Sequence, residues 1–420
     1  MINVDKNKKI NFLLLLIFSS FLLRLIAIYF FRGSYVDTTL LSSDVNEWNI
    51  LLQNLIKYKS YSFYTFDGQL IPSVYMPPVY PFFLYIIKIL TFSEGVSFVY
   101  ITIFIQTILS TYSVYLFYQL NEYFFSKKVS LTNSFIFSFF PINIYACGQI
   151  SSITLQIFIS LLFLKFFLVI LKDKKNLSLV LFSIISAVLI LTRGEFILVF
   201  IIIIFYGIFK KDIKIVNFAK IILIISLIIS PYLVRNYMHF NQLLIVKSFG
   251  YNLWKGNNQF SSVQGYENYK NLNLQELESA LNDLEKNKNY EINRDKVFFN
   301  EAKNNIVNDP LKFLQLFLKK ILSFYFIDIN STYPNYYNLI NIIPTIAISL
   351  LSFFGLFTFL KQEKNINNYL SIYLFSNLIL FSIFFILPRY KLIIFPIQLI
   401  MAMHFIVYVL KKKTNSQEKK

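Results

Sequence analysis

Three acidic residues follow directly after the first long apolar run of the chain. Asp37, Asp44 and Glu47 lie in segment 35–64, in a protein with only 22 acidic residues against 40 Lys and Arg. A carboxylate close to apolar surface can have a raised pKa and act as a general base. The alternative is structural, because with Ser43 as N-cap Asp44 and Glu47 would sit in a first helical turn, where acids favour the helix dipole. The segment therefore offers either a catalytic base or an ordinary helix start.

A second set of side chains has the chemistry to bind phosphate. Arg193, Arg235, Arg389 and Lys391 stand at the ends of apolar runs, and an arginine can bind phosphate through two parallel hydrogen bonds. One carboxylate base with several arginines suits transfer of a group from a phosphate leaving group, and at a membrane the natural donor is a lipid phosphate. Structural alternatives remain, because Arg193 could pair with Glu195 and the other cations could anchor the ends of spans.

The remaining reactive residue types argue against several other kinds of chemistry. His239 and His404 lie far apart in the sequence and form no metal-binding pattern, so we predict no metal and no cofactor. Cys147 is the single cysteine, so no internal disulfide is possible. The chain has no G-x-x-x-x-G-K-S/T loop, which argues against ATP chemistry.

The composition predicts that membrane helices position these residues. The 420 residues are 56% hydrophobic, 19% aromatic and only 15% charged, whereas soluble domains carry about 25% charged residues. Several apolar runs approach the ~20 residues that cross a bilayer as a helix, and barrel strands would be shorter and alternating. The net charge of +18 is better explained by lysines in cytoplasmic loops than by nucleic acid binding. We therefore predict an all-α polytopic membrane protein that binds no nucleic acid.

Apolar runs and loop lysines predict about ten spans, with both chain ends in the cytoplasm. Residues 79–92 are short for a span, and if they crossed, the lysines near 127 and 174 would fall outside, so we place this run in the outer interface. Residues 12–31 are long enough to remain as an anchor. The predicted spans are nearly free of charge and cover 11–31, 97–119, 129–145, 154–171, 178–192, 196–209, 221–234, 338–360, 369–387 and 391–410.

This topology gathers the polar residues that are not loop lysines on the outer face. Leu274, Leu277, Leu281 and Leu284 recur there at helical spacing. A second external helix is predicted at 291–307, and 311–329 is typical of an interfacial amphipathic helix. The predicted domains are a transmembrane catalytic module (1–234) with a first external loop at 32–96, an external loop domain with the interfacial helix (235–337), and C-terminal spans with a cytoplasmic tail (338–420).

Six segments, in order along the chain, carry a resemblance to a known family. "SPYLVRNYMHFNQLLIVKSFGYNLWKGNN" (230–258) is similar to the signature P-W-x-x-R-N-Y … G-x-N-L-x-x-G-N-N. The other segments are "SDVNEWNILLQNLIKYKSY" (43–61), "FDGQLIPSVYMPPVYPFFL" (66–84), "FFPINIYACGQISS" (139–152), "LILTRGEFIL" (189–198) and "LPRYKLIIFPI" (387–397). The chain resembles the polytopic membrane glycosyltransferases of the GT-C type, in the branch of the dolichyl-phosphate-mannose-dependent protein O-mannosyltransferases and the bacterial aminoarabinose transferases.

The resemblance implies an inverting glycosyltransferase of the bacterial inner membrane whose active site faces the periplasm. It implies that Asp44, supported by Glu47 and Asp37, deprotonates an acceptor hydroxyl, which attacks the sugar of a polyprenyl-phosphate donor. The acceptor is a lipid, a glycan or a protein, and the bilayer is the other partner. The implied phosphate-binding residues are Arg235, Arg389, Arg193 and Lys391, and the implied pocket residues are Tyr390, Trp48, Tyr80, Asn252, Trp254, Asn257 and Asn258.

The chain departs from the family at three places. Segment 147–154 lacks the acid that many relatives carry in the second external loop, Trp48 replaces a commoner tyrosine, and Lys391 replaces a common arginine. Two alternatives therefore stay open: a transporter or flippase for a lipid-linked saccharide, and a membrane assembly protein without catalysis. A transporter would place charged or broken segments within its spans.

Overall fold

The structure is a computed structural model that describes residues 2–36, 43–173, 175–268, 275–331, 336–362 and 365–417. Almost all of its regular structure is helical, and the described strands form one two-stranded antiparallel hairpin. The elements are α1 (Ile2–Val36), α2 (Ser43–Tyr58), β1 (Ser62–Phe66), β2 (Gln69–Pro72), α3 (Val79–Thr91), α4 (Gly95–Asn121), α5 (Lys127–Phe139), α6 (Pro141–Cys147), α7 (Ile153–Asp173), α8 (Asn176–Thr192), α9 (Phe196–Phe209), α10 (Ile215–Phe240), α11 (Phe249–Asn257), α12 (Gln275–Asn282), α13 (Tyr290–Asn308), α14 (Pro310–Tyr325), α15 (Leu339–Leu360), α16 (Asn365–Ile383), the 3-10 helix η2 (Pro388–Tyr390) and α17 (Lys391–Gln417).

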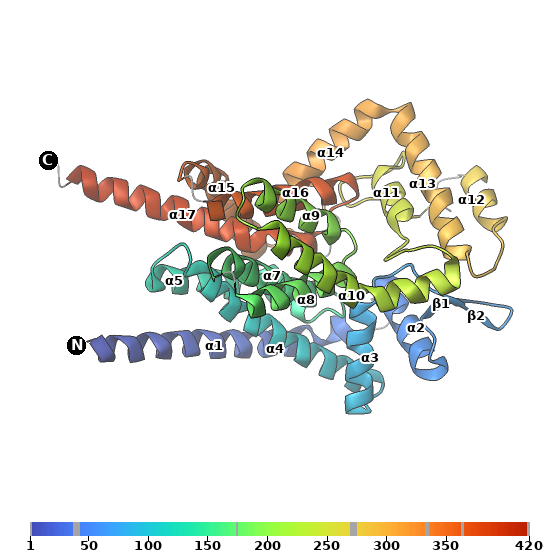
Figure 1. The fold of residues 1–420 in the computed structure, drawn as a ribbon, viewed down its shortest axis with the longest axis horizontal. Helices are drawn as coiled ribbons and strands as arrows, with labels where there is room; N and C mark the ends of the chain where they lie inside the picture. Colours follow the sequence, from blue (N-terminus) through green and yellow to red (C-terminus); the bar gives the residue numbers. More distant parts are fainter. Residues whose placement is uncertain are drawn as a thin grey trace.

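The long apolar helices lie along one another in a bundle, and the described chain ends lie at the same end of it (Figure 1). Within the described residues, seven helices are long and apolar enough to cross a membrane: α1, α4, α7, α10, α15, α16 and the helix that follows η2. The predicted spans 178–192 and 196–209 form the shorter apolar helices α8 and α9 in the same bundle. The prediction of an all-α polytopic membrane protein is confirmed.

The predicted span 129–145 is broken in the middle, into α5 and α6. Pro141 has no N–H to continue the helical ladder, so the last carbonyls of α5 need other donors. The side-chain amide of Asn143 donates to Phe137 O (3.1 Å), and the fully buried guanidinium of Arg24 on α1 donates to Ser138 O (3.2 Å). Arg24 therefore places a charge inside a span, where its hydrogen bonds to α4 and α5 stabilise non-helical backbone.

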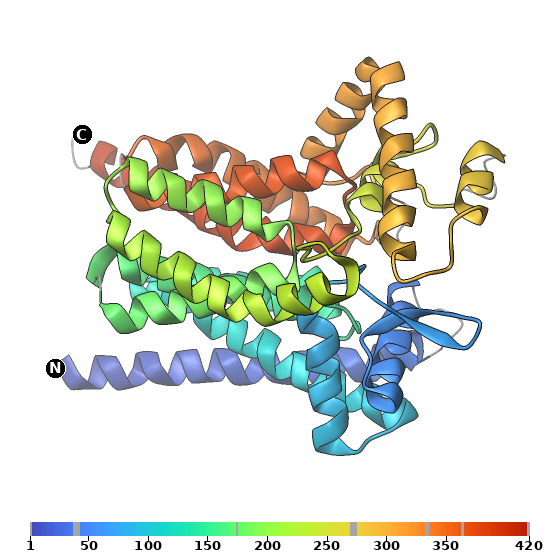
Figure 2. The ribbon, with the colours of Figure 1, turned by 45° about the vertical axis from the view of Figure 1, so that its right-hand side comes forward.

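Two helices run across or obliquely to the bundle at the end opposite Ile2 and Gln417, which we call the distal end (Figures 1 and 2). Helix α3 buries Tyr80 and Leu84 and leaves Ile86 and Leu90 exposed. Helix α14 in the same way exposes a row of apolar side chains, Leu311, Leu314, Leu318 and Leu322. Exposed apolar faces beside a membrane bundle suit the interfacial placement that the sequence predicted for both segments.

The polar part of the chain caps the distal end. Helix α13 confirms the helix predicted at 291–307, and α12 buries Leu277 and Leu281 against it. Helices α2 and α11 and the β1–β2 hairpin lie at the same end (Figure 2). The predicted domain boundary at residue 234 falls inside a helix, because α10 continues to Phe240.

Candidate functional site

A cavity of about 500 Å³ opens at the distal end, between the bundle and the polar cap. Six segments far apart in the sequence line it: α2, the loop 75–77, the α6–α7 junction, the α8–α9 turn, α11 with the residues around it, and the stretch from the end of α16 to η2. Its charged lining residues are three acids and three bases, Glu47, Glu195, Glu267, Arg193, Lys255 and Arg389. Acids and arginines in a largely apolar enclosure are the setting in which carboxylates act as bases and phosphate is bound.

One wall of the cavity carries the arginines. The α8–α9 turn places Arg193 so that its Nε donates to Gln156 Oε1 (3.2 Å) and its Nη1 pairs with Glu195 Oε1 (3.3 Å). The guanidinium groups of Arg193 and Arg389 lie 5.0 Å and 5.8 Å from the ring centre of Tyr390. Burial by itself would lower the pKa of Arg193, but Glu195 and Tyr390 outweigh it and the pKa is raised. The ring of Tyr390 thus holds two cationic groups side by side.

Helix α2 contributes a carboxylate to the cavity. Glu47 and Trp48 line the cavity, and the Trp48 ring packs edge-on against Tyr80 at 5.1 Å. Asp44 comes three residues before Glu47 in the same helix. Residues three or four apart are neighbours on a helix surface. The side chain of Asp44 and the whole of Asp37 lie outside the described part of the chain.

The loop that follows the hairpin is held through its backbone. Glu291 Oε2 accepts hydrogen bonds from Val74 N (2.7 Å) and Tyr75 N (2.9 Å). Arg235 Nη1 donates to Ser73 O (2.6 Å). Further bonds run from Tyr61 Oη to Met76 O (2.8 Å) and from Lys247 N to Val74 O (2.7 Å). This loop brings Tyr75, Met76 and Pro77 to the cavity, so its many backbone bonds fix that part of the lining.

Helix α11 approaches its neighbours unusually closely. A Cβ on Gly250 would lie 2.0 Å from Asp295 O, and a Cβ on Gly256 would lie 1.9 Å from Phe384 O, so both positions require glycine. Asp295 Oδ1 accepts from Tyr251 N (3.0 Å) in the first turn of α11, where a carboxylate favours the helix dipole. These contacts explain the two glycines of "GYNLWKGNN" and present Tyr251 to the cavity.

Comparisons with known proteins support the fold. No family model and no curated protein matches the chain. The oligosaccharyltransferase AglB from Archaeoglobus fulgidus, solved with an inhibitory peptide and a dolichol-phosphate, superposes over 99% of this chain at a TM-score of 0.58 and 15% identity. The chain has a GT-C type fold.

Two further structures of the Archaeoglobus fulgidus oligosaccharyltransferase share this GT-C fold. The form tethered to an acceptor peptide with the NVT sequon matches 95% of this chain (TM-score 0.55, 12% identity), and the apo form matches 97% (TM-score 0.54, 14% identity). The chain spans about half the length of these proteins, since it covers 52%, 50% and 52% of the three solved chains.

Two predicted phosphate-binding residues of this GT-C chain lie outside the large cavity. Lys391 is buried, and its Nζ donates to Tyr325 O (2.6 Å) and Phe326 O (2.5 Å) at the C-terminus of α14, where a lysine satisfies free helix carbonyls. Arg235 lies behind the loop that it binds and does not line the cavity. Neither residue lines the cavity, so its geometry gives no support to the predicted phosphate contacts of Arg235 and Lys391.

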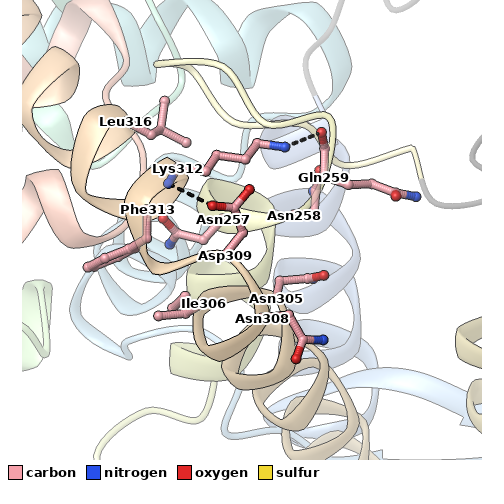
Figure 3. A pocket seen from close by; sticks show the side chains of 10 residues that line it. All are labelled: Asn257, Asn258, Gln259, Asn305, Ile306, Asn308, Asp309, Lys312, Phe313 and Leu316. Carbon is pink, nitrogen blue, oxygen red and sulfur yellow. Dashed lines mark hydrogen bonds between the residues drawn. The ribbon is translucent and has the colours of Figure 1, made fainter.

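Four of the predicted pocket residues are also outside the cavity. Tyr80 donates to Gln106 Oε1 (3.0 Å) behind Trp48, and Trp254 is buried against Phe298. Asn257 and Asn258 instead border a smaller cavity of about 150 Å³ beside the start of α14 (Figure 3). Trp48, Asn252 and Tyr390 are the predicted pocket residues that line the large cavity.

The sequence reasoning missed several residues that shape the site. Lys255 pairs with Glu267 in the lining, and Gln156 orients Arg193. Glu291 and Asp295 on α13 bind segments that are distant in the sequence. Glu291 is 217 residues from its partner Val74, and Asp295 is 44 residues from its partner Tyr251. Their spacing of four on a predicted helix was a signal that one helix face carries two acids, but their partners depend on the fold. Within the described residues, no three His, Cys, Asp or Glu side chains come together as a metal site.

Proposed function

We propose that this chain is an inverting glycosyltransferase that takes its sugar from a lipid-linked phosphate donor. The observation that carries the proposal is the cavity, whose lining includes Glu47 on α2 and two arginines, Arg193 and Arg389, that contact the ring of Tyr390. The GT-C fold supports it, and so does the dolichol-phosphate named in the complex of the archaeal oligosaccharyltransferase. The site would face the exterior or periplasm, because the lysine-rich loops belong to the opposite end.

In this reaction a carboxylate at the start of α2 takes the proton of the acceptor hydroxyl. The acceptor oxygen then attacks the anomeric carbon from the side opposite the phosphate, so a new C–O bond forms while the sugar–phosphate bond breaks. The lipid phosphate leaves with the electron pair of that bond. Arg193 and Arg389 would stabilise the charge that develops on it. We assign the base to Asp44 and the role of supporting acid to Glu47, which comes three residues later on α2 and lines the cavity.

The donor lipid has an apolar path into the cavity. Leu198, Val246 and Phe249 line it, and Leu198 and Phe249 are also exposed on the outside of the protein. These exposed apolar side chains would suit a polyprenyl chain, which would stay in the membrane while its phosphate enters the cavity.

A transfer assay with purified variants tests the proposal. The full chain is reconstituted in nanodiscs with radiolabelled polyprenyl-phosphate sugars and a membrane extract, and the labelled fraction is counted. We expect Asp44→Asn to lower transfer by at least about 100-fold, the scale of general-base catalysis, with unchanged insertion. Asp67→Asn removes an exposed acid from the hairpin turn of the same end and should leave transfer unchanged.

The outcome also separates the two acids. Full activity of Asp44→Asn together with loss in Glu47→Gln would move the base to Glu47. Absence of label transfer by the wild-type chain with every donor, or full activity of the Asp44→Asn, Glu47→Gln double variant, would reject the proposed function.

A further inference from the structure

Arg294 on α13 is not itself a lining residue of the cavity, but it contacts two tyrosines that are, and none of the described residues gives it an acid partner. The guanidinium of Arg294 lies 5.1 Å from the ring centre of Tyr251, 5.0 Å from that of Phe298 and 6.0 Å from that of Tyr75. Tyr75 and Tyr251 both line the cavity. None of the ion pairs or side-chain hydrogen bonds found among the described residues involves Arg294. Among the described residues, its charge is therefore stabilised by the faces of aromatic rings.

The backbone around Arg294 is fixed on both sides. Three residues earlier Glu291 binds the loop at Val74 and Tyr75, and one residue later Asp295 binds the first turn of α11. These bonds join α13 to the two segments that carry the tyrosines. Arg294 thus has a defined place, and its half-buried side chain keeps access to solvent.

Two of the cations that line the cavity differ from Arg294, because each of them is neutralised by an acid. Arg193 pairs with Glu195, and Lys255 pairs with Glu267. A guanidinium that is oriented but has no carboxylate can bind an incoming anion without first breaking an ion pair. Burial would lower the pKa of Arg294, but Tyr64, Tyr75 and Tyr251 outweigh it and raise the pKa, so the side chain stays charged.

Arg294 also lies on the acid-bearing side of the cavity. Burial, and after it the Glu47 carboxylate, raise the pKa of Tyr75, so this carboxylate lies close to the ring that Arg294 contacts. The proposed donor phosphate is assigned to Arg193 and Arg389, which lie in the α8–α9 turn and in η2. A group bound at Arg294 would therefore belong to the acceptor, whose hydroxyl must reach the base on α2.

We propose that Arg294, with Tyr75 and Tyr251, forms a subsite for a carboxylate or phosphate group on a saccharide acceptor. This inference rests on the proposed function. Aromatic rings pack against the C–H faces of a sugar ring, and the guanidinium forms charge-assisted hydrogen bonds with its anionic substituent.

Binding can be measured without any transfer reaction. The full chain in nanodiscs is titrated with D-glucuronate, glucose 6-phosphate and glucose, and tryptophan fluorescence is followed, since Trp48 lines the cavity and Trp254 adjoins Tyr251. We expect at least one anionic sugar to bind about tenfold or more tightly than glucose, as one charged hydrogen bond supplies on the order of 1.5–3 kcal/mol. The better of the two anionic probes distinguishes a carboxylate from a phosphate.

Three variants make the test specific. Arg294→Met keeps the apolar stem and should lose the preference for the anionic sugar, whereas Arg294→Lys should retain part of it. Lys296→Gln removes a charge from an exposed position of the same helix and should change nothing. Equal binding of glucose and both anionic sugars, no binding of either anionic sugar, or an unchanged preference in Arg294→Met would overturn the inference.

The transfer assay separates this inference from the proposed function. With the membrane extract as acceptor, Arg294→Met should raise KM about tenfold or more and change kcat little, because the residue binds the acceptor and does not react. Transfer with unchanged KM in this variant would reject the anion subsite and leave the glycosyltransferase proposal standing.

Discussion

Glu291 shows how a single buried acid can organise the cavity. Its Oε2 accepts three hydrogen bonds, from Ser73 Oγ (3.1 Å), Val74 N and Tyr75 N, while its buried Oε1 has no hydrogen-bond partner among the described residues. Burial raises the pKa of Glu291 to about 7, although the hydrogen bonds from Val74, Ser73 and Tyr75 oppose the shift. A protonated carboxyl would carry its hydrogen on the free oxygen and still accept all three bonds.

The raised pKa of Glu291 predicts a dependence of stability on pH. The folded state keeps a proton that the unfolded chain loses above its ordinary pKa, so stability from this residue is present at low pH and decreases as pH rises through about 7. The loss from pH 4.5 to pH 7 is on the order of 2–3 kcal/mol. Glu291→Gln imitates the neutral acid and should flatten the curve of melting temperature against pH between 5 and 8.

The control for this prediction is Glu276→Gln, which changes an exposed acid on α12 and should keep the slope of the wild type. If Glu291→Gln melts with the same pH dependence as the wild-type chain, then Glu291 is ionised throughout and does not set the slope.

At the scale of elements, two helices beside the bundle present apolar faces that nothing in the described structure covers. Leu90 on α3 and Leu318 on α14 are 73% and 51% exposed, and both helices lie across or obliquely to the bundle (Figure 2). Helices of this kind lie at the membrane interface with the apolar side in the acyl region. They would fix the height of the cavity relative to the bilayer surface.

Spin labels can test this placement. In nanodiscs, a nitroxide at Leu90 or Leu318 should collide more often with oxygen, which concentrates in lipid, than with a water-soluble nickel chelate. A nitroxide at Asn300, which is exposed on α13, should show the reverse. Greater access of the nickel chelate to Leu318 would place α14 in water and remove it from the interface.

The arrangement of the whole molecule predicts which loops face the outside. The hairpin lies at the distal end (Figure 1), and the loop that follows it lines the cavity with Tyr75, Met76 and Pro77. A cysteine in the hairpin turn should react with a membrane-impermeant maleimide in intact cells, whereas a cysteine at Lys174, outside the described residues, should be shielded. Gly68 has a φ of +76°, which a cysteine adopts only with strain, so the exposed neighbour Gln69 is the better labelling site.

The labelling is done in a Cys147→Ser background, because Cys147 is the single native cysteine and is buried. Labelling of the Lys174 cysteine in intact cells, without labelling at Gln69, would invert the topology and move the cavity to the cytoplasmic side.

Local patterns in the amino-acid sequence were sufficient to predict several properties of the fold. Apolar run length predicted the helical membrane fold, because a bilayer requires long helices whose backbone groups bond within the segment. Helical spacing predicted α13 and the buried leucines of α12. The α2 helix start at Ser43 also followed from the sequence.

Which of the polar residues share one cavity depends on how segments far apart in the sequence pack together. Arg389 and Lys391 are two positions apart, yet Arg389 lines the cavity while Lys391 binds the end of α14. Arg235 likewise holds a loop, and the break at Pro141 exposes a carbonyl that Arg24 binds. The direction of a side chain depends on which backbone groups the packing leaves unsatisfied nearby, and those groups come from segments far apart in sequence. For that reason Arg294 and Glu291 could be recognised as parts of the site only after α13 was placed against the loop and α11.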